Sequence, residues 1–256
     1  MTNKVALVAA ASKGLGFGVA RALAQEGARV SMCSRSAADI EAAASKLRAE
    51  TGATVIGFAC DVADTASIQA WVDSSVREFE TIDMLLVNAG GPPAGFFKEL
   101  TEQQWQAAFE LTLMSAIRMI RSVLPHMKHG GAIVTITSSS VREPIERLAL
   151  STVMRSGVVG LVKTLADELA PDGIRINNLM PGRIDTDRVA QLDEMQAKRS
   201  GLSFEEVRQQ SISKIPLGRL GTIEDFGKAA AFLLSPAASY ITGASLRVDG
   251  GMMRSI

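Results

Sequence analysis

The sequence has a single tyrosine, Tyr240, only two cysteines, and no excess of charge of either sign. Lys+Arg and Asp+Glu both count 27 in 256 residues, so the formal net charge is zero. A chain without a basic field, or a Lys/Arg cluster with interleaved aromatics, is not expected to bind nucleic acid. Cys33 and Cys60 lie in apolar runs without metal-ligand spacing. We therefore expect reduced core thiols, a cytoplasmic protein and no metal site.

Long apolar runs are absent as well. No uninterrupted run approaches the roughly 18 residues of a membrane span, so no contact with a membrane is expected. Lys4 followed by a short apolar run imitates a signal peptide, but that run passes directly into glycines, which argues against targeting. What the chain does contain is 47% hydrophobic residues, enough to build the core of one large α/β domain.

Short apolar segments, many of them β-branched, alternate with segments of helical spacing along the whole chain. Such repeated units predict an α/β fold, a doubly wound (Rossmann) parallel sheet with helices on both faces, and without a linker we expect one domain over 1–256. The expected strands are 5–9, 29–33, 54–58, 84–87, 132–137, 175–179 and 245–248. The expected helices are 15–26, 37–50, 65–80, 102–128, 150–170 and 223–235.

The chain from Val5 to Val19 is the first candidate for a binding function. An apolar run ends in small residues, and glycines at 14, 16 and 18 lead into a helical segment. Glycines at such a turn let the backbone approach a phosphate, and the start of the helix supplies free N–H groups and partial positive charge. The spacing departs from G-x-G-x-x-G, however, so a helix start that only packs closely on a sheet is the alternative.

Residues 183–220 interrupt the alternation with a polar, helical segment bounded by Pro181-Gly182 and Gly221. A long excursion of this kind in an α/β unit is usually functional, and we interpret it as a substrate lid; a peripheral helical pair covering the sheet edge is the alternative. Arg183 and Arg188 at its start indicate an anionic group, such as a phosphopantetheine carrier, unless they are ordinary surface arginines.

Several motifs occur in a fixed order. They are A-A-A-S-K-G-L-G at 9–16, C-D-V at 60–62, N-A-G at 88–90, S-S-S at 138–140, D-E-L-A-P-D-G-I-R-I-N at 167–177, P-G-R-I-D-T at 181–186 and I-T-G-A-S-L-R-V-D-G-G at 241–251. With these motifs the whole chain resembles the short-chain dehydrogenase/reductase family, as a divergent member similar to 3-oxoacyl-[acyl-carrier-protein] reductases. The resemblance implies a doubly wound seven-stranded sheet, a bound NAD or NADP, and commonly a homotetramer.

The resemblance also implies which residues contact the cofactor. They are Ser12, Lys13, Gly14, Leu15 and Gly16 at the pyrophosphate, Asp61 and Val62 at the adenine, Asn88, Ala89 and Gly90 at the adenosine ribose, and Pro181, Gly182, Ile184 and Thr186 on the nicotinamide side. Ala10 stands where the family usually has glycine, which is tolerable if its φ is negative. For each of these residues ordinary turn or strand-end packing is the alternative.

Charge at the end of the second expected strand bears on the choice of cofactor. Proteins that bind NAD place an acidic residue there to bond the ribose 2′-OH. This chain has Ser34 and Arg35 instead, with Lys13 in the glycine turn. Two cations and a hydroxyl suit a 2′-phosphate, so we predict NADP over NAD, unless both cations are solvated surface charges.

The family's reaction centre is largely replaced. Its Asn, Ser, Tyr and Lys correspond here to Thr112, Ser138, Ser151 and Arg155, so only the serine is kept. A serine hydroxyl is a far weaker acid than a phenol, and arginine stays charged at working pH. Losing a positioned acid typically costs about 10²–10⁴-fold in rate. A purely structural pairing of Ser151 with Arg155 is also consistent with their spacing of one helical turn.

Two functions remain open from the sequence. The first is an NADP-dependent oxidoreductase that reduces a ketone or a 3-oxoacyl group, with Ser138 polarising the carbonyl, Ser151 or water supplying the proton, and Arg155 holding the cofactor ribose. The second is a catalytically inactive sensor, or a partner subunit, of the same fold. The Met-, Ala- and Leu-rich helices 102–128 and 150–170 predict a subunit interface, and the resemblance implies a homodimer or homotetramer through them.

Overall fold

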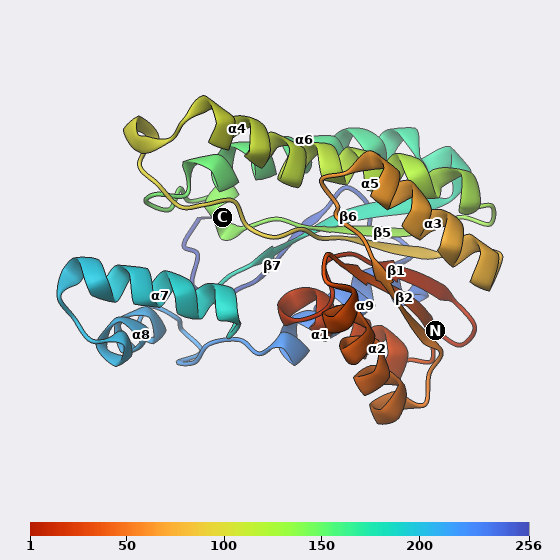
Figure 1. The fold of residues 1–256 in the computed structure, drawn as a ribbon, viewed down its shortest axis with the longest axis horizontal. Coiled ribbons are helices and arrows are strands. Elements are labelled where there is room, and N and C mark those ends of the chain that lie inside the picture. The colour runs from red at the N-terminus through yellow and green to blue at the C-terminus, as the bar shows by residue number, and fades with distance from the viewer. Residues whose placement is uncertain (256) are drawn as a thin grey trace.

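The computed structural model describes residues 1–255 and contains one parallel seven-stranded sheet in the order β3-β2-β1-β4-β5-β6-β7 (Figure 1). Every neighbouring pair of strands is parallel. The strands are β1 (Val5–Val8), β2 (Arg29–Ser34), β3 (Val55–Ala59), β4 (Met84–Val87), β5 (Gly131–Ile136), β6 (Ile174–Pro181) and β7 (Ser245–Val248). The expected doubly wound Rossmann fold is confirmed, with every strand within two residues of its expected bounds.

Helices cover both faces of the sheet. Figure 1 shows α3, α5 and α6 on one face, together with α4, and α1, α2 and α9 on the other. The helices are α1 (Gly14–Gln25), α2 (Ala37–Thr51), α3 (Thr65–Phe79), α4 (Glu102–Ala108), α5 (Ser115–Val123), α6 (Ala149–Glu168), α7 (Asp187–Ser200), α8 (Phe204–Ile212) and α9 (Ile223–Leu234). Short 3-10 turns are η1 (Phe97–Glu99), η3 (Leu124–His126), η4 (Ser139–Val141), η5 (Ala170–Asp172) and η6 (Pro236–Ala238).

The central strands are buried on both sides, which explains their continuous apolar sequence. In β1, Ala6 and Val8 pack into the core under α1, α2 and α9, while Val5 and Leu7 pack into the core under α3, α5 and α6. All four side chains are fully buried. A strand with two covered faces needs apolar residues at every position, because no side chain points to water.

One expected helix is interrupted. The segment predicted as a single helix over 102–128 is divided into α4 and α5 by a π-helical segment, η2 (Phe109–Met114), and ends in the 3-10 turn η3. A π segment inside an α-helix is frequent at functional sites, because it rotates the side chains that follow it. Here it carries Thr112, the residue at the family's Asn position.

Helices α7 and α8 lie apart from the two helical layers and project beyond the carboxyl end of β6 (Figure 1). They are separated by Gly201, which takes a left-handed conformation as the C-cap of α7. They fall within the 183–220 segment expected to form a lid, and a lid role stays a prediction. Within residues 1–255, no helix combines the length and apolarity needed to cross a membrane.

Candidate active site

The glycine turn lies at the carboxyl end of β1, where the strand order reverses between β2 and β4. Helix α1 begins at Gly14, and its N-cap, Lys13, makes no side-chain hydrogen bond to the helix start. Most other helices have a serine, threonine or aspartate side chain that accepts a hydrogen bond from an N–H group of the first turn. Because α1 has no such cap, its first N–H groups stay free and point out of the turn. Such a helix start at a topological switch point is where doubly wound sheets bind a dinucleotide phosphate.

Glycine is required at positions 14, 16 and 18 for different physical reasons. Gly14 has a φ of +60°, a left-handed conformation that residues with a Cβ rarely adopt. A Cβ on Gly16 would lie 2.4 Å from the carbonyl oxygen of Ala10, so any side chain there would push the helix away from the turn. Gly18, in contrast, is needed for close packing between helices and not for approach of a phosphate. A Cβ there would lie 2.4 Å from the carbonyl oxygen of Ile223, where α1 crosses α9.

Ala10 departs from the sequence expectation. The tolerance of a methyl group at this position was predicted on the condition that its φ is negative, but its φ is +49°. The left-handed region costs a residue with a Cβ roughly 1–2 kcal/mol, which explains why glycine is the usual residue here. The side-chain amide of Asn88 steadies the turn by donating to the carbonyl oxygens of Ala9 and Ala10, at 3.3 and 3.2 Å. Asn88 therefore ties β4 to the glycine turn.

The predicted nicotinamide-side residues lie close to the same turn. The methyl group of Thr186 would be 3.7 Å from a Cβ on Gly14, and its hydroxyl caps α7 by accepting from Val189 N–H. Ile184 is buried and its backbone pairs with Gly221. Pro181 ends β6, and Gly182 packs so tightly on Asp249 that a Cβ would lie 2.5 Å from its side chain. The structure thus brings the turn at 12–16 and the segment 181–186 together.

The predicted adenosine-side residues lie at the neighbouring carboxyl ends of β2, β3 and β4. Val62 is buried, while Asp61 is exposed and its carboxylate accepts from Ala63 N–H at 3.0 Å. Ala89 and Gly90 follow β4, and a Cβ on Gly90 would meet nothing within 4 Å. Space is therefore open beside Gly90, after the end of β4.

The two cations expected to bind the 2′-phosphate have different surroundings. Arg35 is exposed, and within residues 1–255 it has no hydrogen bond or ion pair. Lys13 instead pairs with Asp187 at 2.7 Å, and this hydrogen bond raises the pKa of Lys13 and lowers that of Asp187. Because both partners are mostly exposed, the pair is weak, and an incoming phosphate group could displace it.

The three reaction-centre residues that follow β5 make defined hydrogen bonds. Ser138 Oγ accepts from Ser140 N–H at 3.1 Å. Arg155 donates from Nε to Ser151 Oγ at 3.2 Å and from Nη1 to the carbonyl oxygen of Ile136, the last residue of β5, at 2.7 Å. Burial lowers the pKa of Arg155 to about 10, with a further contribution from the charge of Arg188. The guanidinium is still protonated at neutral pH.

The fourth residue, Thr112, faces a small cavity. It is 5% exposed, and its hydroxyl has no hydrogen-bond partner in the described chain. The cavity, about 10 Å³ in volume, is also lined by Asn88, Ser115, Ile136 and Arg155. That volume is about what a single water molecule needs, and the polar lining offers it hydrogen bonds. The site residues at positions 112 and 155 are thereby placed next to one another.

The only phenol of the chain is far from this centre. Tyr240 is fully exposed and precedes β7, so it lies near the amino end of that strand. Its neighbour Ile241 accepts a hydrogen bond from Arg175, near the amino end of β6. The serines at 138 and 151 follow the carboxyl end of β5, at the opposite edge of the sheet. Tyr240 does not replace the missing catalytic tyrosine.

The charged segment between Ser138 and Ser151 serves the surrounding structure. Glu143 accepts from the backbone N–H groups of Arg254 and Ser255, and these bonds lower its pKa. Glu146 pairs with Arg199 of α7 at 3.0 Å. Arg147, at a φ of +66°, lies 4.5 Å from the ring centre of Phe96. These side chains tie the loop to the C-terminal segment and to α7.

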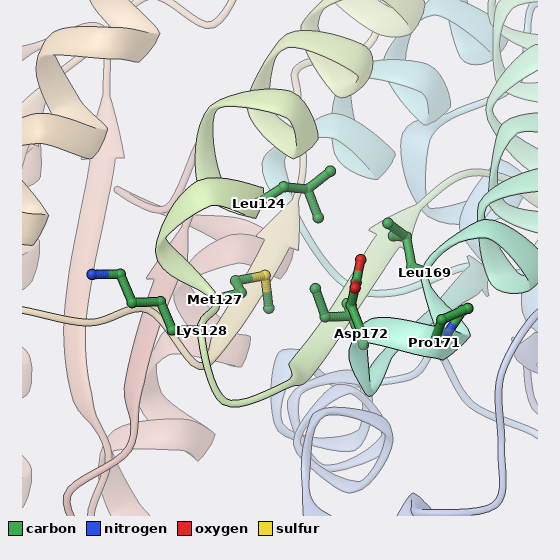
Figure 2. Close-up of a pocket in the computed structure, with 7 residues that line it drawn as sticks. Leu124, Met127, Lys128, Leu169, Pro171 and Asp172 are labelled. Atoms are coloured by element: carbon green, nitrogen blue, oxygen red, sulfur yellow. The ribbon is translucent and has the colours of Figure 1, made fainter.

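A larger cavity lies at the other edge of the sheet. It measures about 380 Å³ and is lined by Leu124, Met127, Lys128, Leu169, Pro171, Asp172 and Ile174. Figure 2 shows the Lys128 ammonium directed away from Asp172. Because Ile174 is the first residue of β6, this cavity lies at the amino ends of the strands, away from the residues described above.

The fold places the glycine turn and the polar cluster around Arg155 at the same carboxyl edge of a doubly wound sheet. Comparison with known proteins shows the family of the chain. The family model described as Enoyl-(Acyl carrier protein) reductase matches residues 9–253. The chain is 33% identical over 255 residues to a monensin polyketide synthase putative ketoacyl reductase from Streptomyces virginiae, covering 98% of this chain and 97% of that protein.

Solved structures agree with the fold in detail. L-sorbose reductase from Gluconobacter frateurii, complexed with NADPH and L-sorbose, superposes with a TM-score of 0.95 at 30% identity, over 100% of this chain and 98% of that one. An NAD⁺-bound xylitol dehydrogenase superposes with a TM-score of 0.92 at 28% identity, over 98% and 99%. The chain belongs to the short-chain dehydrogenase/reductase family.

Proposed function

We propose that this chain is an NADPH-dependent reductase of a ketone or a 3-oxoacyl group, in which a residue other than tyrosine delivers the proton. The observation that carries the proposal is the uncapped start of α1 at a turn where Gly14 and Gly16 leave no side chain. The ketoacyl reductase and the NADPH-bound L-sorbose reductase among its relatives support the same class of reaction.

The chain's own residues fit the cofactor. The free N–H groups at the start of α1 would hold the pyrophosphate, Asn88 and Gly90 would border the adenosine ribose, and Thr186 would lie on the nicotinamide side. Arg35, which has no partner in the described chain, would pair with a 2′-phosphate, and Lys13 would join it by leaving Asp187. When bound, NADPH supplies the hydride for the reduction.

The serines are positioned to donate hydrogen bonds. Ser138 Oγ already accepts from Ser140 N–H, and Ser151 Oγ already accepts from Arg155 Nε. Each hydroxyl proton is therefore available to a substrate oxygen, which a carbonyl needs as negative charge develops on it. The positive charge of Arg155 next to Ser151 stabilises the serine oxygen as its proton leaves. Ser151 is half-buried and would regain its proton from bulk water, while a water in the cavity beside Arg155 would give the Thr112 hydroxyl a hydrogen-bond partner.

Arg155 is fixed rather than free to move. Two of its nitrogen atoms are engaged, and the side chain is 8% exposed, so its charge stays in place through the reaction. The second candidate function, an inactive cofactor-binding sensor or partner subunit, rests on this same observation. A guanidinium held by both a strand carbonyl and Ser151 cannot reorient toward the ribose hydroxyls.

Fluorescence titration with NADPH and NADH, followed by assays against ketones and 3-oxoacyl thioesters, separates the two functions. We expect saturable binding of NADPH and oxidation of NADPH that depends on an added carbonyl compound. NADPH binding with no turnover on any carbonyl would instead support the sensor or partner subunit.

We also propose a homodimer or homotetramer through α4, α5 and α6. Sedimentation velocity measures the number of chains in the assembly.

The variant Arg35→Asp is expected to reverse the choice of cofactor. A carboxylate at the end of β2 repels a 2′-phosphate and can accept a hydrogen bond from a ribose 2′-OH. The ratio of the Kd for NADH to the Kd for NADPH should fall by about 10–100-fold, since a charge-assisted phosphate contact contributes about 1.5–3 kcal/mol. Arg77→Asp, on the exposed surface of α3, is the control. An unchanged ratio in Arg35→Asp would refute the assignment.

A further inference from the structure

Two arginines lie over the carboxyl ends of β4 and β5. Arg188, in the first turn of α7, donates from Nη2 to the carbonyl oxygen of Pro92 at 3.0 Å, and its Nε would lie 3.2 Å from a Cβ on Gly91. This places its guanidinium against the segment that follows β4. Arg155 holds the carbonyl oxygen of Ile136 at the end of β5, the neighbouring strand.

Neither arginine has a negative partner. Among residues 1–255, no carboxylate lies within ion-pair distance of Arg155 or Arg188. The nearby carboxylates are already paired, Asp185 with Arg208 and Asp187 with Lys13. Both guanidinium groups are withdrawn from water, which lowers the pKa of each. Two neighbouring cations without a counter-ion raise the free energy of the folded protein. A bound anion would offset that destabilisation.

The other arginines of this segment do not share the property. Arg183 pairs with the buried Asp193, Arg199 with Glu146, Arg208 with Asp185 and Arg219 with Asp225. Of the two arginines that the sequence singled out at the start of the lid, Arg183 therefore has a structural partner, and only Arg188 is left with unmatched charge beside the reaction centre.

We propose that Arg188 binds the carboxylate of an oxo-acid substrate, with Arg155 contributing charge from beneath. The proposal rests on the proposed reductase function and names its substrate class. A guanidinium matches a carboxylate in shape and can bond both of its oxygens. Arg188 keeps its Nη1 and Nε free for this, because its one hydrogen bond to the protein is made by Nη2.

A carboxylate fits this position better than the phosphate of a pantetheine carrier. The pantetheine arm puts its phosphate many bonds from the thioester carbonyl, so a cation that meets it should lie at an exposed rim. Arg188 is half-buried and held against Gly91 and Pro92, in the segment that follows β4 and Asn88. The anion it binds must lie close to the reacting carbon, as a carboxylate does in a 2-oxo or 3-oxo acid.

The test compares acids with their neutral esters. Phenylpyruvate and acetoacetate, each beside its methyl ester, are titrated by calorimetry into the NADP⁺-saturated wild-type protein, Arg188→Gln and Arg199→Gln. We expect the wild type to bind at least one acid about 10–100-fold more tightly than its ester, the advantage expected of a charge-assisted bidentate contact. Arg188→Gln should lose that advantage and keep the affinity for the ester. Arg199→Gln, on the same helix, should behave like the wild type.

Several results would overturn the proposal. They are equal affinity of acid and ester for the wild type, no saturable binding of either acid, and an equal loss in Arg199→Gln. Weaker NADPH binding by Arg188→Gln would assign the cation to the cofactor, and stronger competition by pantetheine 4′-phosphate would assign it to a carrier. Because calorimetry needs no turnover, tight acid binding by an inactive protein would support the carboxylate site while refuting the reductase function.

Discussion

Replacing Gly16 with alanine is expected to weaken NADPH binding by about 100-fold. The added Cβ would lie 2.4 Å from the carbonyl oxygen of Ala10 and 2.9 Å from the Cα of Ala11, so the turn and the helix start must move apart. Both contacts are with backbone atoms, which cannot swing aside as a flexible side chain can. Losing two charge-assisted hydrogen bonds to the pyrophosphate costs about 3 kcal/mol, which corresponds to that change in Kd. Fluorescence titration with NADPH measures it.

The stability of this variant must be measured beside its affinity. Overpacking at a tight contact typically costs about 1–3 kcal/mol, so urea unfolding should show a folded but less stable protein. Gly160→Ala is the matched control, because a Cβ at that α6 position meets nothing within 4 Å in the single chain, and sedimentation velocity shows whether it leaves the proposed α6 interface intact. It should bind NADPH as the wild type does and gain up to about 1 kcal/mol from helix propensity. Wild-type affinity in Gly16→Ala would mean that the cofactor phosphates lie elsewhere.

The sheet could be predicted from the sequence because burial on both faces leaves a clear signal. A strand such as β1 must be apolar at every position, and the turn after it must be small, so both features are visible without a structure. The same topology explains why residues far apart in the sequence meet at the candidate site. Parallel strands end at one edge, so Ser34, Asn88 and Ser138 are gathered there by strand order alone.

Other features depend on contacts that leave no pattern in the sequence. The left-handed φ of Ala10 is imposed by the turn between β1 and α1, and alanine itself gives no sign of it. The π-helical segment at 109–114 lies in a stretch with ordinary helical composition. Arg183 and Arg188 look alike in sequence, and only the partner of each, Asp193 for one and Pro92 O for the other, distinguishes their roles.

The double substitution Ser151→Tyr with Arg155→Lys should raise any ketone reductase activity by about 10²–10⁴-fold, the usual contribution of a positioned general acid. A phenol has a pKa near 10, and a neighbouring ammonium lowers it, so tyrosine gives up its proton far more readily than serine. Lysine also releases the Ile136 carbonyl that Arg155 Nη1 now holds, which frees a cation for the cofactor ribose. Steady-state kcat with NADPH and a ketone measures the change.

The control is Ser151→Phe with Arg155→Lys, which adds the same ring without the hydroxyl. If the gain comes from proton donation, the tyrosine variant alone is faster, and its rate falls at high pH as the phenol ionises. If both variants gain equally, the effect comes from lysine or from filling space above α6. If the tyrosine variant is no faster than the wild type, Ser138, Ser151 and Arg155 perform chemistry that a phenol does not assist. The proposed ketone reduction would then be wrong, even with cofactor binding intact.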